Sequence, residues 1–257
     1  MGCVENEIQK PVEKVQLKEE SSETSKTVIK NAVLINEGSR FTGSLLIDGE
    51  KIGKIFHAPH PLPGDPVLQH ARVIDADGLY LLPGVIDDQV HFREPGLTHK
   101  GDIFTESRAA VAGGVTSYMD MPNTLPTTVT QRLLEEKYQR AGEVSAANFS
   151  FLMGVTNDNI EEVLKTDPER VAGIKIFLGS STGNMLVDDP TVLNDLFRYA
   201  PTLLAVHCEE ESIIRANAEK ARRQFGEMVP FSRHPFIRSI EACYASTAKA
   251  LERAHRF

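Results

Sequence analysis

The stretch GVIDDQVHFREPG, residues 84–96, decides how the rest of the chain is interpreted. An apolar run, residues 81–86, leads into it, and a Pro-Gly pair ends it. A strand places alternate side chains on one face, and that face would carry Asp87, Gln89, His91 and Arg93. Ionisable groups at the end of a buried strand cost desolvation energy unless a metal, a substrate or a partner satisfies them. The stretch therefore predicts a functional site.

Composition is compatible with a small-molecule enzyme and argues against some other classes. Its 257 residues, 41% of them hydrophobic, can bury a sizeable core. A formal charge of -8 and a pI near 5.5 argue against a nucleic-acid partner. No apolar run approaches the length of a membrane span. Three unpatterned cysteines fit a reducing compartment, and we predict a cytoplasmic protein.

The amino-terminal third divides into a tail and a β-rich segment. Residues 1–26 are rich in glutamate, lysine and serine and contain no aromatic residue, which predicts a disordered, solvated tail. Short β-rich runs follow at 28–35, 44–47, 51–56 and 72–74, with a hairpin signal at Asp48-Gly49. Residues 27–80 are therefore predicted to form a small β-subdomain.

From residue 81 to residue 257 the pattern alternates between apolar strands and amphipathic helices. Strands are predicted at 82–92, 116–121, 148–155, 173–178 and 203–208, and helices at 103–112, 129–141, 159–165 and 191–199. This spacing is typical of a parallel sheet, either an open doubly wound sheet or a closed barrel. No glycine-rich dinucleotide fingerprint follows any strand, which favours the barrel. We predict an α/β protein with a (β/α)8 TIM-type barrel.

The last segment, residues 209–257, is predicted to be largely helical and yields no sixth strand. Five strands cannot close an eight-stranded barrel, and an open edge leaves backbone groups unpaired. We therefore expect that the chain is a fragment with about five βα units, or that something else covers the edge.

Polar side chains occupy the predicted carboxyl ends of several strands, where a barrel builds its active site. His91 and His207 end two of these strands, and two imidazoles with neighbouring carboxylates suggest a zinc-type site. Lys175 lies within an apolar strand, where its stem could be buried with the ammonium snorkelling to the barrel mouth. Alternatively, desolvation would depress its pKa, and the neutral amine could add carbon dioxide to become a carbamate that bridges two metals.

Five sequence motifs carry a family resemblance. They are, in order, Pro83-Gly84-Val85-Ile86-Asp87, His91-Phe92-Arg93-Glu94-Pro95-Gly96, Met121-Pro122-Asn123-Thr124, Gly173-Ile174-Lys175 and Val206-His207-Cys208-Glu209. From about Thr27 onward the chain resembles the dihydroorotases of the amidohydrolase superfamily, of the long bacterial type. The Arg-Glu-Pro-Gly run separates dihydroorotases from hydantoinases and allantoinases, which usually lack that arginine. The resemblance implies a metal-bearing βα barrel with a small β-subdomain.

The resemblance also implies roles for particular residues. The metal ligands would be His91, Gln89, Lys175 and His207, with Lys175 N6-carboxylated between two zinc ions. Arg93 and Asn123 would hold the substrate carboxylate, a task that suits the guanidinium fork. The alternative for Arg93 is a salt bridge to Glu94 or Asp87.

Two departures from the family pattern matter. Gln89 stands where the family has a histidine, and an amide oxygen is a poorer zinc ligand than imidazole. The metal at that position would be weak, absent or held with help from Asp87, so one or two zinc ions are expected. The aspartate that acts as general acid and base would lie beyond Phe257, and we expect little activity from the chain itself. His234 and His255 are interpreted as surface histidines.

The predicted function is that of a dihydroorotase, a zinc-dependent hydrolase that interconverts N-carbamoyl-L-aspartate and L-dihydroorotate in pyrimidine biosynthesis. One alternative is a non-catalytic dihydroorotase-like scaffold subunit, and another is a hydantoinase or allantoinase-like amidohydrolase. The partners expected are a small-molecule substrate and a second copy of the chain in a homodimer, with no nucleic acid and no membrane.

Overall fold

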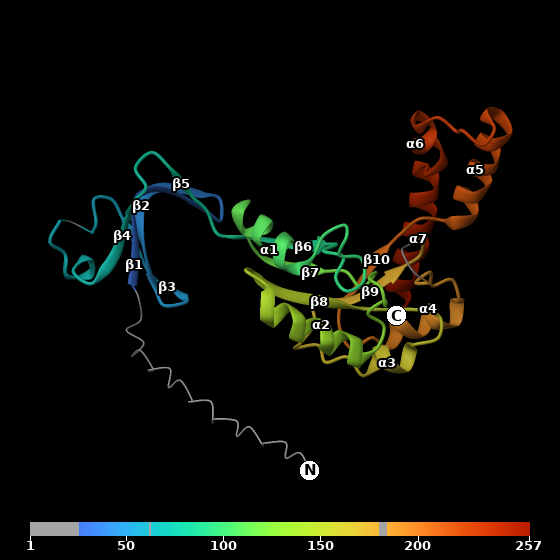
Figure 1. The fold of residues 1–257 in the computed structure, drawn as a ribbon, viewed down its shortest axis with the longest axis horizontal. Coiled ribbons are helices and arrows are strands. Elements are labelled where there is room, and N and C mark those ends of the chain that lie inside the picture. The colour runs from blue at the N-terminus through green and yellow to red at the C-terminus, as the bar shows by residue number, and fades with distance from the viewer. Residues whose placement is uncertain (1–25, 62, 180–183) are drawn as a thin grey trace, which may run out of the picture. The chain divides into compact units, whose positions relative to one another are not determined.

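A computed structural model describes residues 26–61, 63–179 and 184–257 (Figure 1). The chain splits into two compact units, one ending at Pro83 and one beginning at Gly84. The tail predicted for residues 1–26 lies outside the described residues, apart from Lys26, which begins the first strand.

The first unit is a small β-sheet. Its strands are β1 (Lys26–Asn36), β2 (Ser39–Asp48), β3 (Lys51–His57), β4 (Ala71–Asp75) and β5 (Tyr80–Leu81), and a short 3-10 helix, η1 (Pro66–Leu68), precedes β4. The order is β3-β2-β1-β4, with β5 also pairing with β1. The hairpin predicted after Asp48 joins β2 to β3, and Gly49 supplies the positive φ of 60° that the turn requires.

The second unit contains a parallel sheet whose strands lie side by side in chain order (Figure 1). The strands are β6 (Val85–Val90), β7 (Val115–Asp120), β8 (Asn148–Gly154), β9 (Gly173–Phe177) and β10 (Leu204–His207). The connecting helices are α1 (Ile103–Ala112), α2 (Gln131–Val144), α3 (Ile160–Leu164) and α4 (Pro190–Tyr199). Buried side chains such as Phe151, Ile174 and Leu196 form one core shared by strands and helices. Strand-helix alternation thus builds the predicted parallel α/β layer.

Strand β6 differs from the prediction of a buried strand over 82–92. The strand covers only Val85–Val90, and Val85 and Ile86 are 54% and 62% exposed. The physical reason is that β6 is an outer strand of the described sheet, with a neighbour on one side only. His91 and Arg93 follow the strand, so strand alternation does not set the direction of their side chains.

The carboxyl-terminal segment is helical, as predicted. It contains α5 (Glu211–Phe225), η2 (Phe231–Arg233), α6 (His234–Ile237) and α7 (Ile240–Arg256), and this described segment contains no sixth strand. Several large apolar side chains on these helices are exposed, among them Phe236, Tyr244 and Leu251. Among the described helices, none has the length and apolar character that a membrane span requires.

Candidate active site

The predicted site residues lie at or just beyond the carboxyl ends of the parallel strands. His91 follows β6, Asn123 follows β7, Lys175 lies on β9 and His207 ends β10. In the β9–β10 register, Phe177 pairs with His207. The carboxyl ends of parallel strands share one edge of the sheet, so four elements contribute polar groups to a common region.

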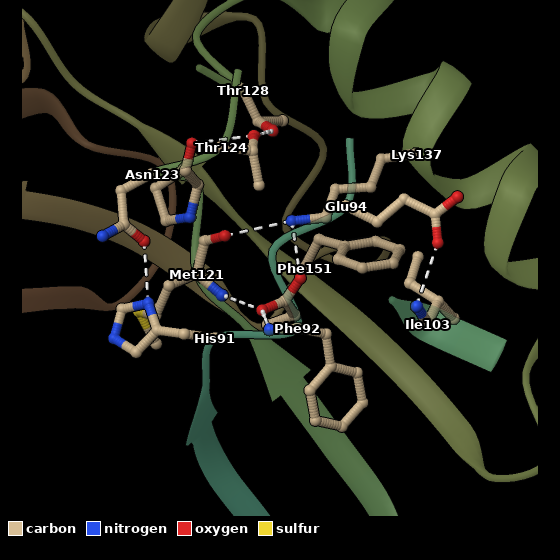
Figure 2. A network of polar contacts seen from close by, with 12 residues as sticks. His91, Phe92, Glu94, Ile103, Met121, Asn123, Thr124, Thr128, Lys137 and Phe151 are labelled. Atoms are coloured by element: carbon tan, nitrogen blue, oxygen red, sulfur yellow. Dashed lines mark hydrogen bonds and ion pairs between the residues drawn. The ribbon is translucent and has the colours of Figure 1, made fainter. Parts of the chain in front are cut away.

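His91 is held by Asn123 across the gap between two strand ends (Figure 2). The imidazole Nδ1 lies 2.8 Å from the Asn123 Oδ1, an arrangement in which Nδ1–H donates to the amide oxygen. Burial lowers the pKa of His91 and outweighs the hydrogen bond to Asn123, which raises it, while the charge of Arg93 lowers it further. The neutral ring is therefore favoured, with its Nε2 lone pair available as a ligand.

Arg93 adopts an unusual backbone conformation directly after His91 and Phe92. Its φ of 69° lies in the left-handed region, which costs about 1–3 kcal/mol in a residue other than glycine. Its Nη1 is buried and has no hydrogen-bond partner among the described residues. Glu94, the salt-bridge partner considered from the sequence, instead pairs with Arg140 through Nε at 2.7 Å. Arg93 therefore has an unused donor in the region that also holds His91.

The rest of this loop is fixed by Glu94 and Gly96. The Glu94 Oε2 accepts from the backbone N–H of Ile103 at 2.9 Å, at the start of α1. Gly96 has a φ of 80°, and a Cβ placed on it would lie 1.8 Å from the carbonyl oxygen of Leu125. Only glycine fits where these two loops approach each other. This explains why the stretch 84–96 ends in glycine.

Replacing Gly96 with alanine is expected to lower the free energy of unfolding by more than the roughly 1–2 kcal/mol that a left-handed conformation costs. The additional loss comes from the collision with Leu125, which must displace one loop. Gly114→Ala is the matched control, because Gly114 has a φ of 88° and nothing within 4 Å of the added Cβ. Urea denaturation of both variants measures the difference, and equal losses would contradict the collision.

A buried ion pair between Asp120 and Lys137 supports the loop after β6, through a hydrogen bond from the Phe92 N–H to Asp120. The sequence did not predict this pair. The Lys137 Nζ is 2.7 Å from the Asp120 Oδ2, and the side chains are 1% and 0% exposed. The available signals were an aspartate at the end of an apolar strand, and a lysine on the helix face that also carries Leu134 and Ala141. Each residue alone is typical of a solvated charge, so neither was singled out.

Lys175 is buried in the middle of β9. Ile174 and Ile176 belong to the core shared with the helices, so Lys175 between them faces the opposite side of the sheet. Only 3% of the residue is exposed, and its Nζ lies 5.2 Å from the centre of the Phe177 ring. Burial lowers the pKa of Lys175, which favours the neutral amine. This environment suits the carbamate hypothesis better than the snorkelling one.

His207 is oriented by an acidic neighbour. Its Nε2 lies 2.8 Å from the Glu209 Oε2, which also pairs with Arg238 at 3.2 Å. Its ring centre lies 6.2 Å from that of Phe177, which in turn neighbours Lys175. The tautomer with its proton on Nε2 donates to Glu209 and leaves the Nδ1 lone pair for a ligand, an orientation that metal-binding histidines commonly use.

The two other proposed ligands lie on β6. Gln89 is exposed, and its backbone N–H donates to the Asp87 Oδ1 at 3.1 Å. No group of three His, Cys, Asp or Glu side chains placed to hold a metal occurs in the described part of the chain. The donor set nevertheless fits zinc in its chemistry: two imidazoles each keep one nitrogen available, and a carbamate on Lys175 would supply oxygen. Gln89 adds the weakest donor to this set.

The fold and the position of these residues define an α/β protein of the barrel class, with polar groups at the carboxyl ends of its strands. Residues 78–192 match the sequence model of the dihydro-orotase-like family. A dihydroorotase of Methanosarcina acetivorans is 34% identical over 225 residues, covering 86% of this chain and 46% of that protein. An allantoinase of Escherichia coli is 31% identical over 206 residues, covering 77% of this chain and 44% of that protein. Residues 78–192 are thus similar to the dihydro-orotase-like family.

Solved structures show the same fold. An L-hydantoinase (dihydropyrimidinase) from Arthrobacter aurescens superposes with a TM-score of 0.80 at 23% identity, covering 90% of this chain and 50% of that chain. A dihydropyrimidinase from Brevibacillus agri gives a TM-score of 0.75 at 26% identity with the same coverage. The predicted barrel class and the small β-subdomain are thereby confirmed. The chain spans about half the length of the relatives it matches.

Proposed function

We propose that this chain provides the amino-terminal part of a dihydroorotase site, in which N-carbamoyl-L-aspartate and L-dihydroorotate are interconverted. The observation that supports it most is Arg93, whose buried Nη1 has no partner among the described residues. A guanidinium with an unused buried donor is suited to a carboxylate, because charge-assisted hydrogen bonds are strong where water is excluded. Dihydroorotate carries a carboxylate, whereas hydantoin and allantoin do not.

The remaining roles follow from the contacts in the site. Asn123 sets the ring orientation of His91, and Glu209 sets that of His207. His91, His207 and a carboxylated Lys175 would hold zinc, with Gln89 and Asp87 as weak additional donors. Bound zinc would act as a Lewis acid toward the ring amide carbonyl. Arg93, together with the side-chain amide of Asn123, would hold the substrate carboxylate. This contact would orient the ring amide of the substrate toward the metal ligands.

Arg93→Met is expected to weaken L-dihydroorotate binding to the purified, zinc-loaded chain by about 10- to 100-fold, because hydrogen bonds to charged groups contribute about 1.5–3 kcal/mol. Isothermal titration calorimetry measures this change. Arg132→Met, which alters an exposed arginine of α2, is the matched control and should bind like the wild type.

The same titration with hydantoin and allantoin separates the candidate functions. Stronger binding of the two uncharged rings would contradict the dihydroorotase proposal and favour the allantoinase-like alternative, for which the Escherichia coli relative argues. The exposed amide of Gln89 argues for the scaffold alternative. A chain that takes up no zinc and binds none of the three ligands would support that alternative. We further propose that the chain forms a homodimer and is located in the cytoplasm. Sedimentation of the purified chain tests the oligomeric state.

A further inference from the structure

We propose that Asp120 and Lys137 are positioning residues that fix the two loops carrying His91, Arg93 and Asn123. The inference deepens the proposed function and rests on it for the roles of these three residues. The placement of the loops themselves rests only on the contacts described below.

The Asp120 carboxylate joins the two loops directly. Its Oδ1 accepts from the backbone N–H of Phe92 at 3.0 Å and from the backbone N–H of Met121 at 3.0 Å. Phe92 stands between His91 and Arg93, and Met121 stands two residues before Asn123. One oxygen atom therefore joins the two loops near the His91–Asn123 hydrogen bond, beside the backbone hydrogen bond from the Met121 N–H to the Val90 carbonyl at 3.0 Å.

Lys137 holds this carboxylate from helix α2. Its Nζ lies 2.7 Å from the Asp120 Oδ2 and donates to the Met121 carbonyl at 3.0 Å, so it contacts the second loop twice. The Phe151 ring lies 4.8 Å from the ammonium and helps to exclude water. One turn further along α2, Arg140 pairs with Glu94, which anchors the far end of the first loop. Helix α2 thus supports both loops.

A stabilising role alone does not account for a pair buried to this degree. Replacing a buried ion pair with apolar side chains of similar size is often neutral or stabilising. An apolar pair, however, provides no acceptor for the Phe92 N–H, which lies outside the strands. The feature that an ion pair adds here is a fixed acceptor at a defined place between two loops.

Two double variants separate positioning from stability. Asp120→Asn with Lys137→Met removes both charges and keeps an oxygen acceptor, whereas Asp120→Leu with Lys137→Met removes the acceptor as well. Nitrogen-15 NMR of the histidine rings reports whether His91 keeps one Nδ1–H tautomer, and calorimetry reports zinc affinity. We expect the asparagine variant to fall between the wild type and the leucine variant, because it keeps the acceptor for Phe92 but loses the Lys137 contacts. We expect the leucine variant to lose the single tautomer and to bind zinc about 10- to 100-fold more weakly.

Leu196→Ala is the control for stability, because this buried residue lies on α4 and its loss destabilises the core by leaving a cavity. If Leu196→Ala disturbs the His91 tautomer as much as the leucine variant does, the positioning role is overturned. The positioning role is also overturned if the leucine variant keeps both the His91 tautomer and the zinc affinity of the wild type. A wild-type chain that binds no zinc contradicts the metal part of the proposed function, whereas the tautomer comparison still decides the positioning role.

Amide hydrogen exchange in the wild-type chain tests the proposal even if the leucine variant does not fold. The Phe92 N–H has Asp120 as its acceptor and belongs to no strand, so its protection depends on that carboxylate. We expect it to exchange as slowly as the amides of the core strands. Fast exchange of the Phe92 amide, at rates like those of exposed loops, would overturn the proposal.

Discussion

Replacing Lys137 with methionine is expected to lower the free energy of unfolding by about 3–5 kcal/mol, because Asp120 would keep a buried charge with no counterion. Asp120 is fully buried, and Lys137 is its ion-pair partner. Methionine fills a similar volume, so lost packing contributes little. Urea denaturation followed by far-ultraviolet circular dichroism measures the loss, since the chain contains no tryptophan to report by fluorescence.

Arg132→Met on the same helix is the control. Arg132 pairs with Glu136, but these side chains are 72% and 53% exposed, and such pairs contribute at most about 1 kcal/mol. Adding Asp120→Asn to Lys137→Met should restore most of the lost stability, because it removes the isolated charge. Similar losses for Lys137→Met and Arg132→Met would mean that burial of the pair has no energetic consequence.

Helix positions could be predicted from the sequence because their signals are local. Helix α1 has the predicted bounds, 103–112, since Asp102 caps its first turn and Gly113-Gly114 ends it. Helix α4 begins one residue before the prediction, at Pro190, which follows its cap Asp189. Caps and glycines act within a few residues, so a pattern read along the chain contains them.

The surroundings of β6 could not be predicted, because they depend on distant parts of the chain. The apolar residues Val85 and Ile86 read as buried, but whether a strand is covered depends on which elements pack beside it. Similarly, no local pattern contains the positive φ of Arg93 or the close approach of Gly96 to Leu125. For this reason the strand predicted at 82–92 was longer than β6, which covers Val85–Val90.

The residues of the candidate site remain a prediction from the sequence, and their contacts could be predicted only in part. His91 and His207 were identified because each follows an apolar run at a predicted strand end, and Lys175 because it is a charged group within an apolar strand. Asn123 was predicted to contact substrate, and the structure adds a hydrogen bond to His91. The pairing of Asp120 with Lys137 joins a strand end to a helix, and no local pattern links those positions.

Replacing Lys175 with alanine is expected to weaken zinc binding by about 100-fold or more. Loss of a residue that only orients a ligand already costs about 10- to 100-fold, so loss of a direct ligand should cost at least as much. The buried, desolvated amine is the group that would carry the carbamate. Calorimetric titration and elemental analysis of the purified chain measure zinc affinity and content.

Bicarbonate separates a carbamate ligand from a lysine that only packs. Added bicarbonate should raise the zinc content of the wild type and leave that of Lys175→Ala unchanged, since the variant has no amine to carboxylate. Lys220→Ala, at an exposed position of α5, is the control and should respond like the wild type. Carbon-13 NMR with labelled bicarbonate should detect a carbamate in the wild type and in Lys220→Ala, and no carbamate in Lys175→Ala. A folded Lys175→Ala chain with wild-type zinc affinity would remove Lys175 from the metal site and leave its burial to packing.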